Sequence, residues 1–266
     1  MNQGISGVMK VVIVDAHVHL ELPVPYVLSD LSGMAISPEA LIDSMERYGI
    51  DKSVLMGSST SAQVSLETQE ENHRLIVEAS RKYSKKIIPF AFINPRSGKA
   101  GLELAKKCFS EYGMKGLKIW PWADFPINCK AVYDLAEICR EYRVPLSVHT
   151  DNLDPRAHPW LIGEVAKDFP DLTVIAAHMS AEVSLDSIIV AKNYDNVILE
   201  ASPAPPCHAI EKAVEVIGDS RITWGTDWPF WDQRLPLARI RSLRIPEKSK
   251  EKILGENILR ILRMEE

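Results

Sequence analysis

The chain has 266 residues, a net charge of −5 and 46% hydrophobic residues, which is typical of one soluble globular domain. The acidic balance gives no reason to expect a nucleic acid or an anionic membrane surface as partner. No window approaches the about 18 continuous apolar residues of a membrane span, and the start of the chain lacks the apolar core of a secretory signal, so we expect a cytoplasmic protein.

Short apolar runs alternate along the chain with longer amphipathic segments. Each run is almost continuously apolar, as expected of parallel strands that are covered on both faces. The runs predict strands over residues 10–16, 52–57, 86–93, 114–120, 144–150, 172–178, 196–202 and 221–227.

Helices are predicted between these strands. The first begins with Ser37 as N-cap and Pro38 at its first position, and it ends at Gly49. The other amphipathic segments cover residues 66–83, 99–113, 129–142, 158–170, 184–194 and 207–218, and a helical region covers 246–266.

Eight strand–helix repeats in a chain of this length predict the α/β class and a single (β/α)₈ TIM barrel. The C-terminal helical region would extend this barrel, and one domain would cover residues 1–266. The alternative is an open doubly wound sheet, but no glycine-rich phosphate turn follows the first strand. The four cysteines have no paired spacing, which favours free thiols over a disulfide framework.

Polar residues stand at the ends of several predicted strands, where such barrels place catalytic groups. His17 and His19 follow the first strand, and His149, His178 and Asp227 end the fifth, sixth and eighth. Each has an ordinary explanation by itself: an HxH pair arises by chance, a single histidine can be structural, and the aspartate can cap a turn. Their joint occurrence at strand ends is much harder to explain in that way.

The spacing of the first pair indicates a metal site. Side chains alternate along a strand, so His17 and His19 point the same way, into the barrel mouth. Two neutral imidazoles suit Zn²⁺, and a carboxylate can complete the set while one position stays open for water or substrate. Asp227 could supply the carboxylate, because the eighth strand lies beside the first in a closed barrel. His149 faces it across the mouth.

Several motifs resemble those of the amidohydrolase superfamily: DAHVHL at the first strand, the strand-end histidines, WGTDWP at the eighth strand and GENILRIL near the C-terminus. More narrowly, they are similar to its branch of small metal-dependent hydrolases and decarboxylases, which includes aminocarboxymuconate semialdehyde decarboxylase and several lactonases. The resemblance extends from Asp15 to about Leu262. It implies that His178 is a catalytic imidazole or supports a ligand, that Asp227 acts as acid or base, and that the metal ligands are His17, His19, His149 and Asp227.

Three further residues are candidates for substrate binding. For Lys118 the resemblance implies either contact with a substrate oxygen or carboxylate beside one metal, which we favour, or carboxylation and bridging of two metals. Trp120 could stack on an apolar or planar substrate, or simply pack on the barrel rim. Arg156 could bind a substrate carboxylate, or be an ordinary solvated loop residue.

The leading hypothesis is a metal-dependent hydrolase that attacks a small lactone, ester or amide with a metal-activated water. One Zn²⁺, with Mn²⁺ as the alternative, would lower the pKa of that water from 15.7 to about 7. The second hypothesis is a nonoxidative decarboxylase of a small unsaturated or aromatic carboxylate. A non-enzymatic metal-binding barrel is disfavoured, because catalytic candidates accompany the ligands. The partner expected is a small-molecule substrate, and the resemblance makes a homodimer an option.

Overall fold

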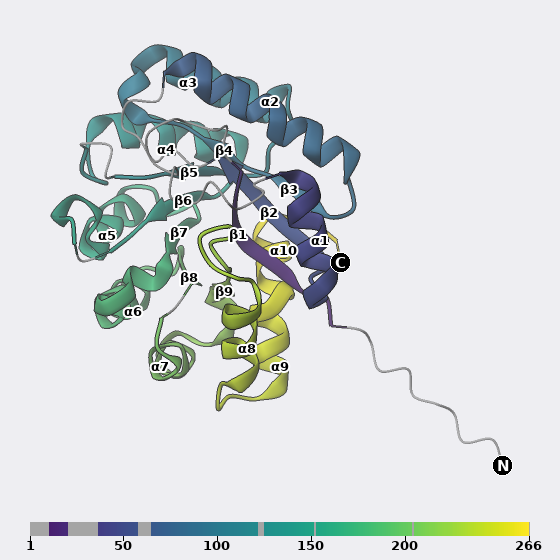
Figure 1. Cartoon of the computed structure of the whole chain (residues 1–266). Helices are drawn as coiled ribbons and strands as arrows, with labels where there is room; N and C mark the ends of the chain where they lie inside the picture. Colours follow the sequence, from purple (N-terminus) through teal and green to yellow (C-terminus); the bar gives the residue numbers. More distant parts are fainter. Residues whose placement is uncertain are drawn as a thin grey trace.

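The computed structural model describes residues 11–20, 37–57, 65–121, 125–151, 153–203 and 205–265. Parallel strands run through the centre of the molecule and helices surround them (Figure 1). The strands are β1 Val14–Leu20, β2 Lys52–Gly57, β3 Ile87–Pro89, β4 Ala91–Phe92, β5 Leu117–Ile119, β6 Leu146–His149, β7 Val174–Ala177, β8 Val197–Ala201 and β9 Ile222–Trp224.

The strands follow one another in chain order, as a barrel requires. One sheet holds β1 to β3 and the other β4 to β9. The amide of Phe90, between β3 and β4, donates to the carbonyl oxygen of Leu55 in β2 at 2.9 Å. At the other edge, the amide of Asp227 donates to the carbonyl oxygen of His17 at 2.8 Å. The amide of His19 donates to the carbonyl oxygen of Trp228, also at 2.8 Å. These bonds bring the first and last strands of the barrel together.

Helices pack around the strands, and the first shows why its sequence forms a helix. The Ser37 hydroxyl accepts from the amide of Ala40 at 3.1 Å, and Gly49 ends the helix with a φ of 72°. The helices are α1 Pro38–Tyr48, α2 Leu66–Lys82, α3 Gly98–Ser110, α4 Lys130–Tyr142, α5 Pro159–Asp168, α6 Ser184–Asn193, α7 Cys207–Ile217 and α8 Arg234–Ser242.

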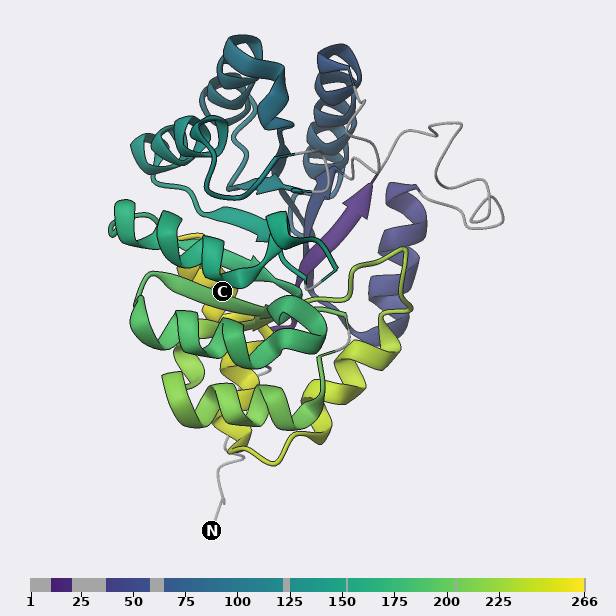
Figure 2. The same cartoon turned by 90° about the vertical axis from the view of Figure 1, so that its left-hand side faces the viewer.

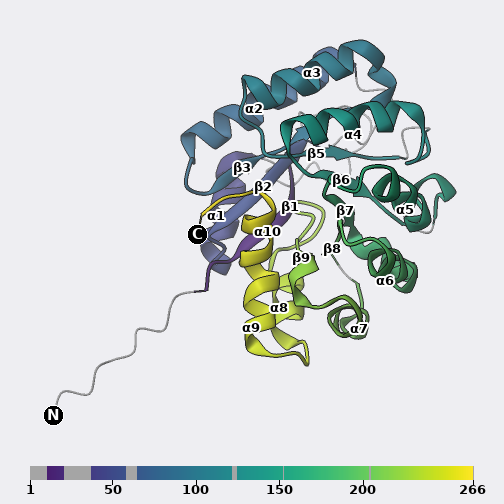
Figure 3. The same cartoon turned by 180° about the vertical axis from the view of Figure 1, so that it is seen from behind.

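The C-terminal extension packs on the first strands, as Figure 3 shows from behind. It consists of α9 Glu247–Glu251, a π-helical turn over Lys252–Glu256 and α10 Asn257–Ile261. The indole of Trp224 in β9 donates to the carbonyl oxygen of Leu254 at 2.8 Å. Apolar side chains complete the contact between this extension and β1 to β3, among them Ile258, Leu259, Val14, Ala16, Val54 and Ile88.

The structure corrects three details of the predicted elements. β1 covers residues 14–20 instead of 10–16, because it pairs with β2 as far as Gly57, so the two histidines lie inside the strand. The third predicted strand is divided at Phe90 into β3 and β4. The helix α8 was not predicted; its Pro236 stands in the first turn, where proline is tolerated. Figure 2 shows α8 near α1, and residues of both line one groove.

Two expectations about the whole chain can be compared with the described residues. All four cysteines are free, as their spacing indicated. None of the described helices is both long enough and apolar enough to cross a membrane.

Candidate metal centre

Two histidines of β1 and one aspartate converge at the barrel mouth. The Nε2 atoms of His17 and His19 are 3.0 Å apart, which confirms that the side chains point the same way. An Asp227 carboxylate oxygen lies 3.6 Å from Nε2 of His17 and 3.2 Å from Nε2 of His19. Asp227 follows β9 and has a φ of 61°, a left-handed conformation that is uncommon for aspartate. The sequence therefore places these three donors together correctly.

The partners of the other ring nitrogens determine where the protons sit. Nδ1 of His17 donates to a Glu200 carboxylate oxygen at 2.8 Å, and Nδ1 of His19 donates to the carbonyl oxygen of Gly57 at 3.1 Å. Burial, together with the charge of Lys118, lowers the pKa of His17 well below its usual value, so this imidazole is neutral. With Nδ1 protonated, both Nε2 atoms present electron pairs to each other and to the Asp227 carboxylate.

This donor set fits a divalent cation. Three electron-pair atoms at 3.0 to 3.6 Å repel one another unless a cation lies between them. Adjacent ligands of an ion with bonds of 2.0–2.2 Å are about 3 to 3.5 Å apart, which matches these separations. Two imidazoles and one carboxylate suit Zn²⁺ or Mn²⁺. The residues present can therefore hold such an ion.

His178 and His149 lie next to this set in different ways. A ring nitrogen of His178 and donor atoms of His17 and Asp227 all lie within 4.8 Å of one another. The rings of His149 and His178 are 4.7 Å apart, but Nε2 of His149 bonds to an Asp151 carboxylate oxygen at 2.8 Å. Among the described residues, the compact group thus contains His178, whereas His149, the ligand implied by the resemblance, is engaged by Asp151.

The pKa of Asp227 is lowered in this setting. Burial alone would raise it, but the neighbouring imidazoles of His19, His178 and His17 lower it below the usual range. The carboxyl group is therefore ionised, as a metal ligand must be.

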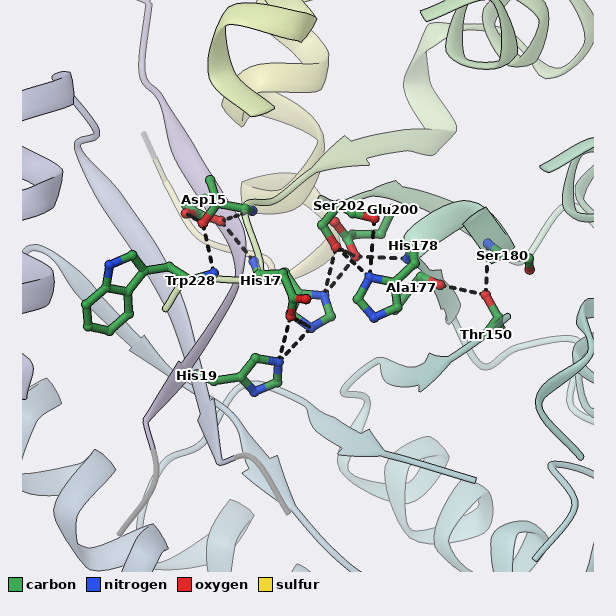
Figure 4. Close-up of polar contacts among 12 residues, drawn as sticks. Asp15, His17, His19, Thr150, Ala177, His178, Ser180, Glu200, Ser202 and Trp228 are labelled. Carbon is green, nitrogen blue, oxygen red and sulfur yellow. Dashed lines mark hydrogen bonds and ion pairs between the residues drawn. The ribbon is translucent and has the colours of Figure 1, made fainter. Parts of the chain in front are cut away.

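A second aspartate, Asp15, holds the Asp227 segment against β1. Its carboxylate accepts from the amide and hydroxyl of Thr226 at 2.9 and 2.6 Å, and from the side chain of Gln233 at 2.8 Å. Burial raises its pKa to about 7 even though these bonds lower it. Figure 4 shows that Asp15 lies to one side of the imidazoles. Its position indicates a structural role in placing Asp227.

Lys118 of β5 is buried within electrostatic reach of the imidazoles. Its side chain is 2% exposed, and its Nζ has no hydrogen-bond partner among the residues that the structure describes. Burial lowers its pKa to about 8, although Glu200 and Asp227 oppose the shift. The pKa of His149 is also lowered. Burial is the largest cause, and the positive charge of Lys118 adds to it. A buried ammonium without an acceptor is costly, and an anionic ligand would satisfy it.

The two remaining candidates for substrate binding are placed differently. The ring of Trp120 is 5.8 Å from that of His149, edge to face, so Trp120 borders the site. Phe230 lies 5.8 Å from the His19 ring. Arg156 pairs with Asp154 in its own loop at 2.7 to 3.0 Å.

Residues 14–264 match the family described as Amidohydrolase. The chain belongs to the amidohydrolase family. This confirms the resemblance seen in the sequence and explains why the donors converge at one end of a barrel. No curated protein matches the sequence.

Solved structures share the barrel of this amidohydrolase. One is 2,6-dihydroxybenzoate decarboxylase in complex with 2,6-dihydroxybenzoate, with a TM-score of 0.80, 16% identity and coverage of 95% of this chain and 98% of that one. Another is dihydroxybenzoic acid decarboxylase from Polaromonas with bound manganese and 2-nitroresorcinol. Its TM-score is 0.75 and its identity 15%, and the match covers 95% of this chain and 97% of that one. A third is an uncharacterised TIM-barrel protein from Bordetella bronchiseptica. Its TM-score is 0.72 and its identity 20%, and the match covers 94% of this chain and 98% of that one. Identities this low show a common fold.

The sequence shows Glu200 and Ser202 at the end of the seventh predicted strand, but sequence reasoning gave them no role in this amidohydrolase site, and it missed Asp151. Glu200 and Ser202 stand at the end of β8, and Asp151 follows β6. Glu200 gave one signal: it is a carboxylate inside the apolar run VILEA, where a charge is expensive unless it is paired. Nothing in the sequence shows that its partner is His17, because 183 residues separate the two.

Proposed function

We propose that the protein is a metal-dependent nonoxidative decarboxylase of a small planar carboxylate, with hydrolysis of a lactone or ester as the second candidate. The family is common to both reactions, and the solved decarboxylases with the same fold support the first. This reverses the order of preference that the sequence alone suggested.

The observation that carries the proposal is the buried ammonium of Lys118. With no hydrogen-bond acceptor among the described residues, it would pair favourably with a negatively charged group of the substrate. A carboxylate supplies charge and two acceptor oxygens, whereas a neutral lactone supplies only a carbonyl. The Lys118 site is therefore better matched to a substrate that carries a carboxylate.

Aromatic rings border the site on two sides. Trp120 follows β5 beside His149, and Phe230 follows β9 beside His19. Flat apolar surfaces of this kind suit an unsaturated or aromatic substrate, which packs between rings with little loss of conformational freedom. They support a planar carboxylate over a flexible aliphatic one.

His17, His19 and Asp227 would hold the ion, with His149 as the fourth ligand that the resemblance implies. A bound divalent cation polarises a substrate oxygen and orients the substrate. Lys118 would neutralise the substrate carboxylate. When the bond to this carboxylate breaks, CO₂ leaves, the electron pair stays on the substrate carbon, and a proton must reach that carbon. His178 would relay this proton: its Nε2 electron pair would accept it from water and pass it to the carbon, while Nδ1 donates to the carbonyl oxygen of Ser202 at 3.2 Å.

The test is a paired assay of protein loaded with Mn²⁺ or Zn²⁺. One panel contains hydroxybenzoates and unsaturated carboxylates, with CO₂ release measured; the other contains lactones and aryl esters, with acid release measured. We expect metal-dependent CO₂ release that Lys118→Met reduces. Ester or lactone hydrolysis without CO₂ release from any carboxylate would refute the decarboxylase proposal and favour the hydrolase.

A further inference from the structure

One carboxylate lies behind two of the imidazoles. Glu200 of β8 is 2% exposed, and one of its oxygens accepts three hydrogen bonds. The donors are Nδ1 of His17 at 2.8 Å, the hydroxyl of Ser202 at 2.8 Å and the backbone amide of His178 at 3.3 Å. Figure 4 shows Glu200 and Ser202 on the side of these imidazoles opposite His19.

The network continues through Ser202 to the second imidazole. Nδ1 of His178 donates to the Ser202 hydroxyl at 3.0 Å, and that hydroxyl donates to Glu200. The same Nδ1 also lies 3.2 Å from the carbonyl oxygen of Ser202, which can only accept. Both imidazoles are therefore protonated on Nδ1, the side that faces Glu200 and Ser202.

We propose that Glu200 is the positioning residue of the centre: it fixes the tautomer of His17 directly and, through the Ser202 hydroxyl, reinforces the His178 tautomer that the Ser202 carbonyl oxygen also favours, so that both Nε2 electron pairs face the reaction site. This inference rests on the proposed metal-dependent function. A carboxylate that accepts from Nδ1 also makes the opposite nitrogen more basic and a better ligand. One buried side chain thus prepares metal binding by His17 and proton transfer by His178.

The fold makes room for this arrangement at one glycine. A Cβ on Gly225, just after β9, would lie 2.5 Å from Cβ of His17 and 2.7 Å from the second oxygen of Glu200. Any side chain there would separate the carboxylate from the imidazole. The close approach of these three residues shows that the Glu200–His17 contact is built into the barrel wall.

The test combines metal affinity with a direct measurement of tautomers. Mn²⁺ binding is measured for the wild type and Glu200→Leu, which removes the acceptor, by the electron paramagnetic resonance of free Mn²⁺. Tautomers are measured in metal-free protein labelled with ¹⁵N-histidine, from the long-range couplings of each ring nitrogen. For the variant we expect 10- to 100-fold weaker Mn²⁺ binding and a His17 ring that averages between tautomers. His73 in α2 is an internal reference, because its Nε2 accepts from the amide of Phe92, far from Glu200 along the chain.

Matched variants separate positioning from general damage. Asp15→Asn removes another buried carboxylate, one that accepts no bond from an imidazole, and should leave the His17 tautomer unchanged. Ser202→Ala should keep the His17 tautomer, because Glu200 remains. If Glu200→Leu does not fold, Glu200→Asp withdraws the oxygen by one methylene and should give smaller changes in the same direction.

The outcomes distinguish this inference from the proposed function. Wild-type tautomers and wild-type Mn²⁺ affinity in the Glu200 variants overturn the inference, whatever the enzyme catalyses. A wild-type protein that binds neither Mn²⁺ nor Zn²⁺ overturns the proposed function, and the tautomer measurement still decides whether Glu200 orients the imidazoles.

Discussion

Replacing Lys118 by methionine should stabilise the fold while it removes substrate binding. In the folded protein burial lowers the pKa of Lys118 from 10.5 to about 8. Each pKa unit corresponds to about 1.4 kcal/mol, so the buried charge costs about 3 kcal/mol of unfolding free energy at pH 7. Methionine has a similar length, no charge and an adaptable apolar side chain.

The sign of this effect gives a pH dependence. A lysine whose pKa is lowered by folding destabilises the fold by the full amount below its folded pKa, here about 8. The penalty fades as the pH rises toward 10.5, because the unfolded chain then loses its proton too. The stability advantage of Lys118→Met should therefore fall from about 3 kcal/mol at pH 7 to about 2 at pH 9 and under about 1 at pH 10.

The assay is urea unfolding of chelator-treated protein at these three pH values. Lys115→Met is the matched control: it removes the same charge from an exposed position three residues earlier, and should change stability by less than about 0.5 kcal/mol. With a carboxylate substrate, Lys118→Met should lower kcat/KM about 10- to 100-fold through the lost charged hydrogen bond. Equal stability of wild type and variant at pH 7, or a difference that does not change with pH, would refute the reasoning.

Three more predictions concern the metal centre. Purified protein should contain about one equivalent of Zn²⁺ or Mn²⁺ by elemental analysis, lost in the His17→Ala/His19→Ala double variant; two equivalents would indicate a second ion. His178→Ala should keep its metal and lose activity, whereas His149→Ala should bind Mn²⁺ at least 10-fold more weakly; the reverse result in a Mn²⁺ titration would make His178 the ligand. Gly225→Ala should lose metal and cost about 1–3 kcal/mol in urea unfolding, and an unchanged variant would contradict the close packing described there.

The sequence predicts residue types and strand order better than it predicts side-chain contacts. The alternation of β1 places His17 and His19 on one side, because that depends only on local backbone geometry. The placement of Asp227 beside them depends on barrel closure, which follows from the number of repeats. The division of the third strand at Phe90 depends on packing with other strands, and nothing local indicates it.

The partners of the histidines were beyond sequence reasoning for a different reason. Asp151 follows His149 by two residues, and its carboxylate is hydrogen-bonded to Nε2 of His149. The spacing alone does not predict this bond, because in another loop conformation the two side chains would lie apart. Glu200 meets His17 only because β8 and the turn after β9 approach β1, at a glycine. Contacts of this kind arise from the closed barrel as a whole, and only the three-dimensional structure shows them.

The buried charged groups differ in how many hydrogen bonds the protein gives them. The Asp15 carboxylate accepts four bonds from its surroundings, including the amide of His17 at 3.2 Å, and one Glu200 oxygen accepts three. These bonds offset part of the cost of burying the two groups, although burial still raises the pKa of both, and the second Glu200 oxygen has no hydrogen-bond partner among the described residues. Lys118 receives no such compensation from the described residues. A buried ammonium with no hydrogen-bond acceptor favours a ligand of opposite charge, which supports the proposed carboxylate substrate over a neutral one.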